Sequence, residues 1–147
     1  MTITEFLLAR LSEDKAAARE AAELAEAPWR AAYGRQVETA RGGHLVTPED
    51  EHSYSTDPTD AVGEHIARHD PARVLREVEA KRAIVEAHED LRRVVEDWSH
   101  PDADGMGLVL VDGGECAGCG ETSPCTTLRH LSSIYSDHPE FDAGWAL

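Results

Sequence analysis

The chain has 147 residues, a length typical of one domain that buries a core of its own. Its 29 acidic residues against 14 Lys and Arg give a formal net charge of −15. This charge disfavours general binding to nucleic-acid backbones and leaves open a protein partner with a basic surface. The sequence contains no apolar run of membrane-spanning length and no signal-peptide pattern at its start. We therefore expect a single cytoplasmic domain over residues 1–147 that does not enter a membrane. Association of two or more copies into a homo-oligomer stays open.

Residues 1–28 are predicted to form an N-terminal helix. Thr2 and Glu5 have the spacing of a capping box, in which a hydroxyl and a carboxylate bond each other's backbone N–H groups. Apolar residues then recur every three or four positions, and Pro28 is expected to end the helix. The recurring residues are Ile3, Phe6, Leu7, Leu11, Ala18, Ala21 and Ala25.

Residues 29–60 lack a helical period and are predicted to be irregular or to contain a small hairpin. The two candidate arms, Gln36–Ala40 and His44–Thr47, flank Arg41-Gly42-Gly43. Beyond the arms, prolines, acids and hydroxyl residues are typical of an exposed loop.

Residues 61–98 are predicted to form two helices. The first is short and ends at His69. Asp70 is a good N-cap and Pro71 a good first helical residue, so a second and longest helix should begin there and reach about Trp98. Its apolar residues fall on one stripe and charged residues cover the rest, which predicts a solvated helix with one buried seam.

Residues 99–147 are predicted to form a zinc knuckle, a helix and a tail. A short apolar strand over Leu108–Val111 should lead into the cysteines. Past the cysteines, apolar residues mark one edge of a last helix, and the aromatic residues Phe141 and Trp145 are expected to fold the tail back.

All three cysteines lie in this last part of the chain. Cys116 and Cys119 form a Cys-x-x-Cys pair beside glycines, which let two thiolates turn toward one ion. Ser123 is a good N-cap and Pro124 a good first helical residue, so Cys125 should lie in the first turn of a helix, where a thiolate is favoured. Three converging thiolates predict a structural Zn²⁺ site.

A closed zinc site needs a fourth ligand. An odd number of cysteines in a reducing compartment favours a metal over a disulfide, and a redox role for Cys116 and Cys119 lacks the βαβ context it needs. His88 lies on the apolar seam of the long helix, and we select it as the fourth ligand. Asp112 and Glu115 are less favoured candidates, and a water in the fourth position would instead create a catalytic site.

The other histidines are weaker candidates. His130 lies about 140° around the helix from Cys125 and should point away from it, and His138 lies past the helix end. His65 and His69 have the spacing of a helical metal dyad, but the residue after His65 is not the glutamate that zinc proteases use. A solvated role for these two residues is the preferred interpretation.

Several segments together resemble an uncharacterised family of small proteins encoded by actinobacteria and their phages. The matching segments are Thr4–Arg10, Trp29, His65–His88, Cys125-Thr-Thr-Leu-Arg129 and Tyr135-Ser-Asp-His-Pro139. The family is a domain of unknown function, so the resemblance implies no activity. In similar sequences the position of His88 closes the long helical segment, and the Cys-Thr-Leu-Arg element recurs. The resemblance therefore suggests that His88 and Cys125 form a shared structural pair. The residues around the knuckle vary in such sequences.

We therefore expect a mainly α fold of about four helices with a short β element and a C-terminal Cys-x-x-Cys zinc knuckle. The predicted function is that of a non-enzymatic, zinc-stabilised accessory or protein-interaction protein, plausibly phage-related. The alternative is a metal-dependent hydrolase with an open zinc site. A weaker alternative is a regulator that binds nucleic acid through a helix-turn-helix over residues 61–98.

Overall fold

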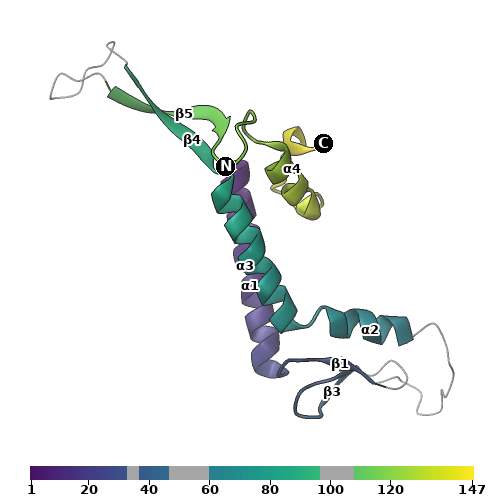
Figure 1. Cartoon of the computed structure of the whole chain (residues 1–147). Helices are drawn as coiled ribbons and strands as arrows, with labels where there is room; N and C mark the ends of the chain where they lie inside the picture. Colours follow the sequence, from purple (N-terminus) through teal and green to yellow (C-terminus); the bar gives the residue numbers. More distant parts are fainter. Residues whose placement is uncertain (33–36, 47–59, 97–107) are drawn as a thin grey trace. The chain divides into compact units, whose positions relative to one another are not determined.

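In a computed structural model, the chain is described over residues 1–32, 37–46, 60–96 and 108–147 (Figure 1). The described part is mainly helical, with four α-helices, a pair of longer strands and three very short ones, which confirms the helical and β parts of the expected fold class. By its internal contacts the chain divides into two compact units. One comprises Met1–Arg10 and Lys81–Leu147, and the other comprises Leu11–Ala80. The single domain expected from chain length stays a prediction.

The first helix, α1, spans Ile3–Leu24. The capping box forms as predicted, because the Thr2 N–H donates to Glu5 Oε2 at 2.8 Å and the Glu5 N–H donates to Thr2 Oγ1 at 3.1 Å. The helix ends at Leu24, earlier than the predicted stop at Pro28. The early end is consistent with a sequence whose apolar face has tapered to alanines, since small side chains bury little area in the last turns.

The unit Leu11–Ala80 contains a small three-stranded antiparallel sheet. Its strands are β1 (Arg30–Ala31), β2 (Val37–Glu38) and β3 (His44–Val46), in the order β1-β2-β3. The β2–β3 pair is the predicted hairpin, with Gly42 at a φ of 77° in its turn. Helix α2 (Asp60–Arg68) lies against β1 and β2. The predicted loop over 48–58 lies outside the described residues.

Helix α3 spans Pro71–Ala87 and begins as predicted, with the Arg73 N–H donating to Asp70 Oδ1 at 2.6 Å. The prediction that it continues to Trp98 is wrong within the described residues, because Asp90–Glu96 form strand β4. This strand pairs antiparallel with β5 (Leu108–Cys116), which extends the short strand expected from the sequence. The β-branched residues Val94 and Val95, which the sequence analysis assigned to the helix, pair with β5 instead.

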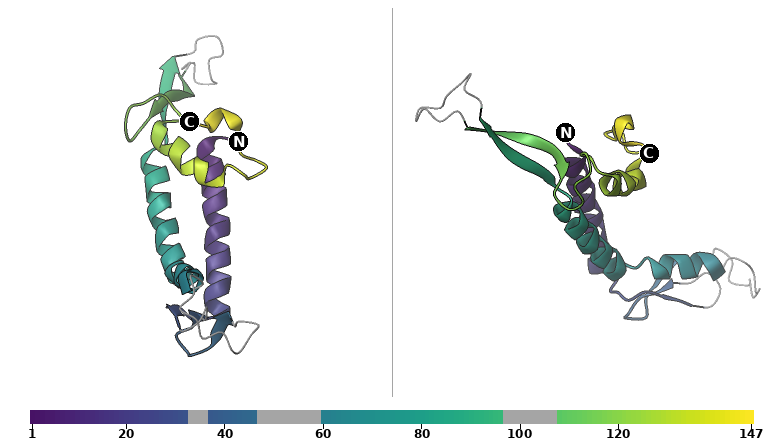
Figure 2. Two further views of the ribbon diagram at one scale, coloured as in Figure 1. Left: turned by 90° about the vertical axis from the view of Figure 1, so that its right-hand side faces the viewer. Right: turned by 45° about the horizontal axis from the view of Figure 1, so that its top comes forward.

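The unit that holds the chain ends is built around Phe6, whose side chain is 0 % exposed. Four rings from the C-terminal tail surround it, so the first turns of α1 lie beside the tail (Figure 2). The surrounding residues are Tyr135, His138, Phe141 and Trp145, with ring centroids 6.2, 5.7, 6.1 and 5.1 Å from that of Phe6. The predicted return of the tail is confirmed.

Helix α4 (Thr126–Ser132) and two short 3₁₀ turns, η1 (Ser133–Tyr135) and η2 (Ala143–Trp145), complete this unit. Leu128 of α4 is 0 % exposed, and Arg129 Nε donates to the Trp145 carbonyl at 3.2 Å. Arg82 of α3 donates to the Leu8 carbonyl of α1 at 3.4 Å. None of the helices in the described part of the chain is both long and apolar enough to cross a membrane.

Candidate metal centre

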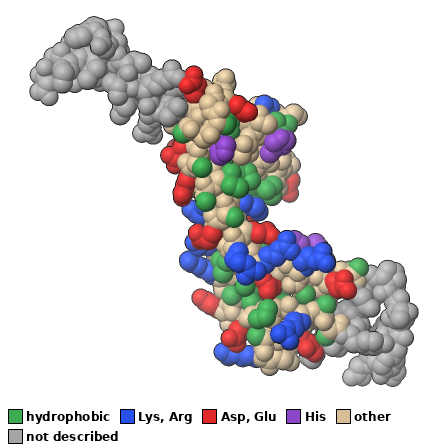
Figure 3. Space-filling view, in the orientation of Figure 1, with side chains coloured by type: hydrophobic (Ala, Val, Ile, Leu, Met, Phe, Trp, Pro, Cys, Tyr) green, Lys and Arg blue, Asp and Glu red, His purple; other side chains and the backbone are tan. Residues whose placement is uncertain are grey.

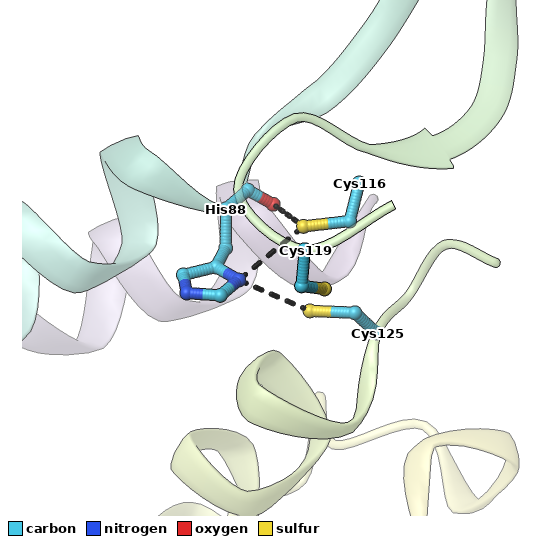
Figure 4. Close-up of side chains that lie close together, drawn as sticks. All are labelled: His88, Cys116, Cys119 and Cys125. Atoms are coloured by element: carbon cyan, nitrogen blue, oxygen red, sulfur yellow. Dashed lines mark hydrogen bonds between the residues drawn. The ribbon is translucent and has the colours of Figure 1, made fainter. Parts of the chain in front are cut away.

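Four side chains from three separate segments converge in the unit formed by Met1–Arg10 and Lys81–Leu147. They are His88, Cys116, Cys119 and Cys125, and their potential ligand atoms all lie within 4.8 Å of one another (Figure 4). Cys116 and Cys125 are buried, His88 is half-buried and Cys119 is exposed. These are the four residues that the sequence singled out, and the fold brings all of them together.

His88 lies directly after the last residue of α3. Its backbone N–H bonds to the carbonyls of Ile84 and Val85, both at 3.1 Å, so the end of the helix fixes the position of its backbone. Its ring points into the cluster, where Nδ1 lies 3.3 Å from Cys116 Sγ and 3.5 Å from Cys125 Sγ. Although the long helix stops earlier than predicted, this histidine still faces the cysteines.

The Cys-x-x-Cys pair begins at the last residue of strand β5 and continues into a tight turn. The Gly120 N–H bonds to the Cys116 carbonyl at 2.8 Å, and the Cys116 N–H bonds to the Glu121 carbonyl at 2.8 Å. Gly120 has a φ of 72°, a left-handed conformation that a side chain would strain. The Ala117 N–H bonds to the Glu89 carbonyl at 2.8 Å, which ties this turn to the residue after His88.

Gly118 lets the turn approach the end of α3 closely. A Cβ on this residue would lie 2.4 Å from the Ala87 carbonyl oxygen and 3.1 Å from His88 Nδ1. The first distance is far shorter than a normal contact, so only glycine fits without movement. The glycine between the two cysteines therefore sets how near the sulfurs come to the histidine.

Cys125 enters the cluster from the start of α4. The predicted cap at Ser123 is wrong, because Cys125 itself is the N-cap residue, with φ −68° and ψ 163°, and the helix begins at Thr126. Ser123 Oγ donates instead to Asp90 Oδ1. The side chain of Glu121 accepts from the Thr126 N–H at 2.8 Å, so a carboxylate from the knuckle satisfies one of the free donors of the helix.

The distances within the cluster are close to those around a tetrahedral ion. With Zn–S near 2.3 Å and Zn–N near 2.0 Å, a tetrahedral site separates sulfur from nitrogen by about 3.5 Å and sulfur from sulfur by about 3.8 Å. The observed separations of Nδ1 from the Cys116 and Cys125 sulfurs, 3.3 and 3.5 Å, fall close to the first value. All ligand atoms of the cluster lie within 4.8 Å of one another, so the widest pair would have to approach by about 1 Å at most when an ion binds.

The surroundings shift the pKa values of two neighbouring thiols in opposite directions. Burial acts to raise the pKa of Cys116, but hydrogen bonds from the backbone and thiol of Cys119, the backbone of Gly118 and the thiol of Cys125 lower it to about 7. For Cys119, a bond from the Glu121 backbone acts to lower the pKa, but desolvation and its two cysteine neighbours raise it to about 11. Thiols this close do not ionise together unless a cation offsets their mutual repulsion.

The remaining predicted candidates do not join the cluster. His130 is exposed on α4, as predicted. His138 packs against Phe6 and lies 2.8 Å from Arg10 through its Nδ1. Glu115 is not among the four clustered residues, and the side chain of Asp112 lies outside the described residues.

The second histidine pair stays apart from any third ligand within the described residues. His65 and His69 are both exposed, with ring centroids 4.6 Å apart on one face at the end of α2. No cysteine, aspartate or glutamate of the described chain groups with them at metal-binding distance. The arrangement is that of two neighbouring surface rings tilted by 46° to each other.

Two further residues shape the site: Gly118, one of the glycines beside Cys119 that the sequence indicated, and Glu121, which the sequence analysis missed. Gly118 determines the approach of the knuckle to α3, and Glu121 caps α4, with its pKa lowered by its bonds to Thr126 and by the nearby His88. The signal for Gly118 was its place inside the Cys-x-x-Cys pair, where a glycine indicates close backbone contact. Glu121 carried a weaker signal, an acidic residue shortly before a helix start.

Comparison with known proteins places the chain in a family. No curated protein and no solved structure matches it. The family match covers residues 1–147 and confirms the expectation of a family of unknown function. The chain therefore belongs to a family of unknown function, DUF6221, along its whole length.

Proposed function

We propose that His88, Cys116, Cys119 and Cys125 bind one Zn²⁺ in a closed structural site, and that the chain is a non-enzymatic, zinc-stabilised accessory or interaction protein. One observation carries the proposal, namely that the four potential ligand atoms lie within 4.8 Å of one another. Burial alone does not require three thiols and an imidazole from three segments to meet at one point. A shared ion gives them a common partner.

The chemistry of the four ligands favours zinc over other metals. Three thiolates and one imidazole form the Cys₃His set of structural zinc sites, whereas calcium and magnesium take oxygen ligands. The backbone N–H of Glu121 donates to the sulfur of Cys119. The backbone N–H groups of Gly118 and Cys119 donate to the sulfur of Cys116. Such N–H donors orient the thiolates and compensate part of their charge, as partners around a bound metal do.

The proposed ion would join three segments that hydrogen bonds such as Ala117 N–H to the Glu89 carbonyl and Ser123 Oγ to Asp90 already bring together. His88 directly follows α3, Cys116 ends β5 with Cys119 in the turn after it, and Cys125 is the N-cap residue of α4. Helix α4 has only seven residues, which is too short for stability on its own. A metal at its N-cap residue would fix the helix against the end of α3, in addition to the burial of Leu128.

A hydrolase with an open zinc site is the alternative function. Such a site keeps one coordination position for water, whereas four protein ligands fill a tetrahedral shell. The grouping of four rather than three side chains therefore supports the structural role. The His65 and His69 pair offers only two ligands and gives the alternative no further support.

The surface charge favours a protein partner for this accessory role. The net charge is −15, and acidic side chains are visible on both described units (Figure 3). An acidic surface attracts a basic protein surface and repels nucleic-acid backbones. We propose a partner with a basic surface, bound in a salt-dependent way.

The test is the metal content of the purified full chain and of two histidine variants. Wild-type protein and His130→Ala, which changes an exposed histidine outside the cluster, should each carry about one zinc per chain. His88→Ala should lose most of its zinc after dialysis against a mild chelator. Equal zinc in His88→Ala and wild type would remove His88 from the site, and a wild-type protein without zinc would overturn the proposal.

A further inference from the structure

We infer that the proposed zinc site is sensitive to oxidation, with Cys119 as the sulfur that reacts first with a peroxide and with release of Zn²⁺ as the result. This inference rests on the proposed function and concerns the regulation of the same site. It follows from an asymmetry among the three sulfurs. Cys119 is exposed, whereas Cys116 and Cys125 are 0 % and 1 % exposed.

Accessibility decides which sulfur meets a small oxidant. Cys119 lies in the outer part of the knuckle, between Gly118 and Gly120, and all three of these residues are exposed. The other two sulfurs face His88 from inside the unit, and Cys116 also lies 3.4 Å from the His88 carbonyl (Figure 4). A peroxide molecule in solvent therefore reaches Cys119 without any opening of the fold.

A resolving sulfur is already present on either side of Cys119. The sulfurs of Cys116 and Cys125 lie within 4.8 Å of that of Cys119, since all ligand atoms of the cluster fall within this distance. A disulfide needs a sulfur–sulfur distance of about 2 Å, so a shift of less than about 3 Å joins the pair. Because Cys119 belongs to an exposed turn, this shift requires no change in a helix.

The reaction balances with hydrogen peroxide as the oxidant. The Cys119 thiolate attacks one peroxide oxygen, the O–O bond breaks, and the departing hydroxide takes a proton to become water. The resulting sulfenic acid is attacked by the thiolate of Cys116 or Cys125, forming the S–S bond and expelling a second hydroxide, which also becomes water. Two thiolates, one peroxide and two protons give one disulfide and two waters, and zinc keeps its oxidation state.

Loss of two thiolates leaves the ion with too few ligands. One thiolate and the His88 imidazole remain, which is half of a tetrahedral shell, so Zn²⁺ dissociates. The N-cap residue of α4, Cys125, then loses its bond to the metal, so the start of the helix is held less firmly. Oxidation would thus loosen the segment from β5 to α4, and reduction with zinc binding would fix it again.

The experiment uses the full zinc-loaded chain titrated with hydrogen peroxide. Released zinc is followed with a chromophoric indicator, and disulfides are located by mass spectrometry of peptides from samples alkylated under denaturing conditions. We expect about one zinc released per peroxide consumed, and a disulfide that contains Cys119. Addition of a dithiol and Zn²⁺ should restore the bound metal.

Two controls decide between outcomes. The zinc content before peroxide tests the proposed function alone, so a zinc-loaded protein that keeps its metal in excess peroxide would overturn only the present inference. A disulfide between Cys116 and Cys125 would also overturn it. In Cys119→Ser loaded with zinc, peroxide-driven release should slow at least about tenfold, and the disulfide map of the wild type decides the matter if that variant does not hold zinc.

Discussion

Replacement of Gly118 by alanine tests how closely the knuckle must approach α3. The new Cβ would lie 2.4 Å from the Ala87 carbonyl oxygen, a backbone atom at the end of a helix that does not move readily. Restoring an ordinary contact requires a displacement of about 1 Å, whereas zinc ligands tolerate deviations of about 0.2 Å. The cysteines on both sides of Gly118 would move with it.

We expect this displacement to weaken zinc binding at least about tenfold, equivalent to about 1.4 kcal/mol. Competition for zinc with a chromophoric chelator measures the dissociation constant in wild type and variant. Gly114→Ala is the matched control, since Gly114 has a φ of 65° but no atom within 4 Å of its would-be Cβ. That control should cost about 1 kcal/mol of folding stability from backbone strain with zinc affinity unchanged. Equal zinc affinity in Gly118→Ala and wild type would refute the reasoning.

Three further outcomes follow from the described contacts. Leu128→Ala should lower the free energy of unfolding by about 2–5 kcal/mol in urea denaturation, because the side chain is 0 % exposed; a loss below 1 kcal/mol would contradict its role in the core. Thr2→Ala should cost about 0.5–2 kcal/mol in the same assay, since the Glu5 N–H loses its cap, and Thr4→Ala serves as a control within the helix. In the metal-free protein the pKa of Cys116 is lowered from 9.0 to about 7, so its ionised form stabilises the folded state fully above pH 9, and this stabilisation is lost as the pH falls through 7. Cys119, whose pKa is raised to about 11, reverses the trend above pH 9, so unfolding titrations should show a stability maximum near that pH, and a steady fall from pH 7 to 9 would contradict the assignment.

The candidate site was predictable because its signals are chemical. A Cys-x-x-Cys pair, a third cysteine near a helix start and a histidine on an apolar seam restrict the ligand set before any fold is known. The choice of His88 did not depend on the length of its helix, since the ring needs only to project from the end of α3. This explains why the four residues converge although the predicted helix boundary was wrong.

The fold was predictable where a local signal was strong. The capping box at Thr2 and the cap at Asp70 both formed, because side chain and backbone meet within a single turn. The change from helix to strand after Ala87 was missed, since β4 is stabilised by pairing with β5, whose first residue lies beyond residue 107. A stripe of charged residues with helical spacing does not reveal a distant strand partner.

The start of α4 shows a different limit of sequence reasoning. Ser123 and Pro124 have the composition of a helix start, but Ser123 bonds Asp90 and the helix begins after Cys125. The capping bond comes from Glu121, five residues before the N–H that it accepts. A cap supplied from outside the usual positions depends on the path of the knuckle, which the sequence alone does not specify.

X-ray absorption spectroscopy at the zinc edge of the purified full chain tests the central claim most directly. The account predicts about three sulfur neighbours near 2.3 Å and one nitrogen near 2.0 Å, with no oxygen in the first shell. A shell in which oxygen replaces one protein ligand would indicate an open site and favour the hydrolase. A zinc ion without sulfur neighbours, or a protein that binds no zinc, would contradict the account.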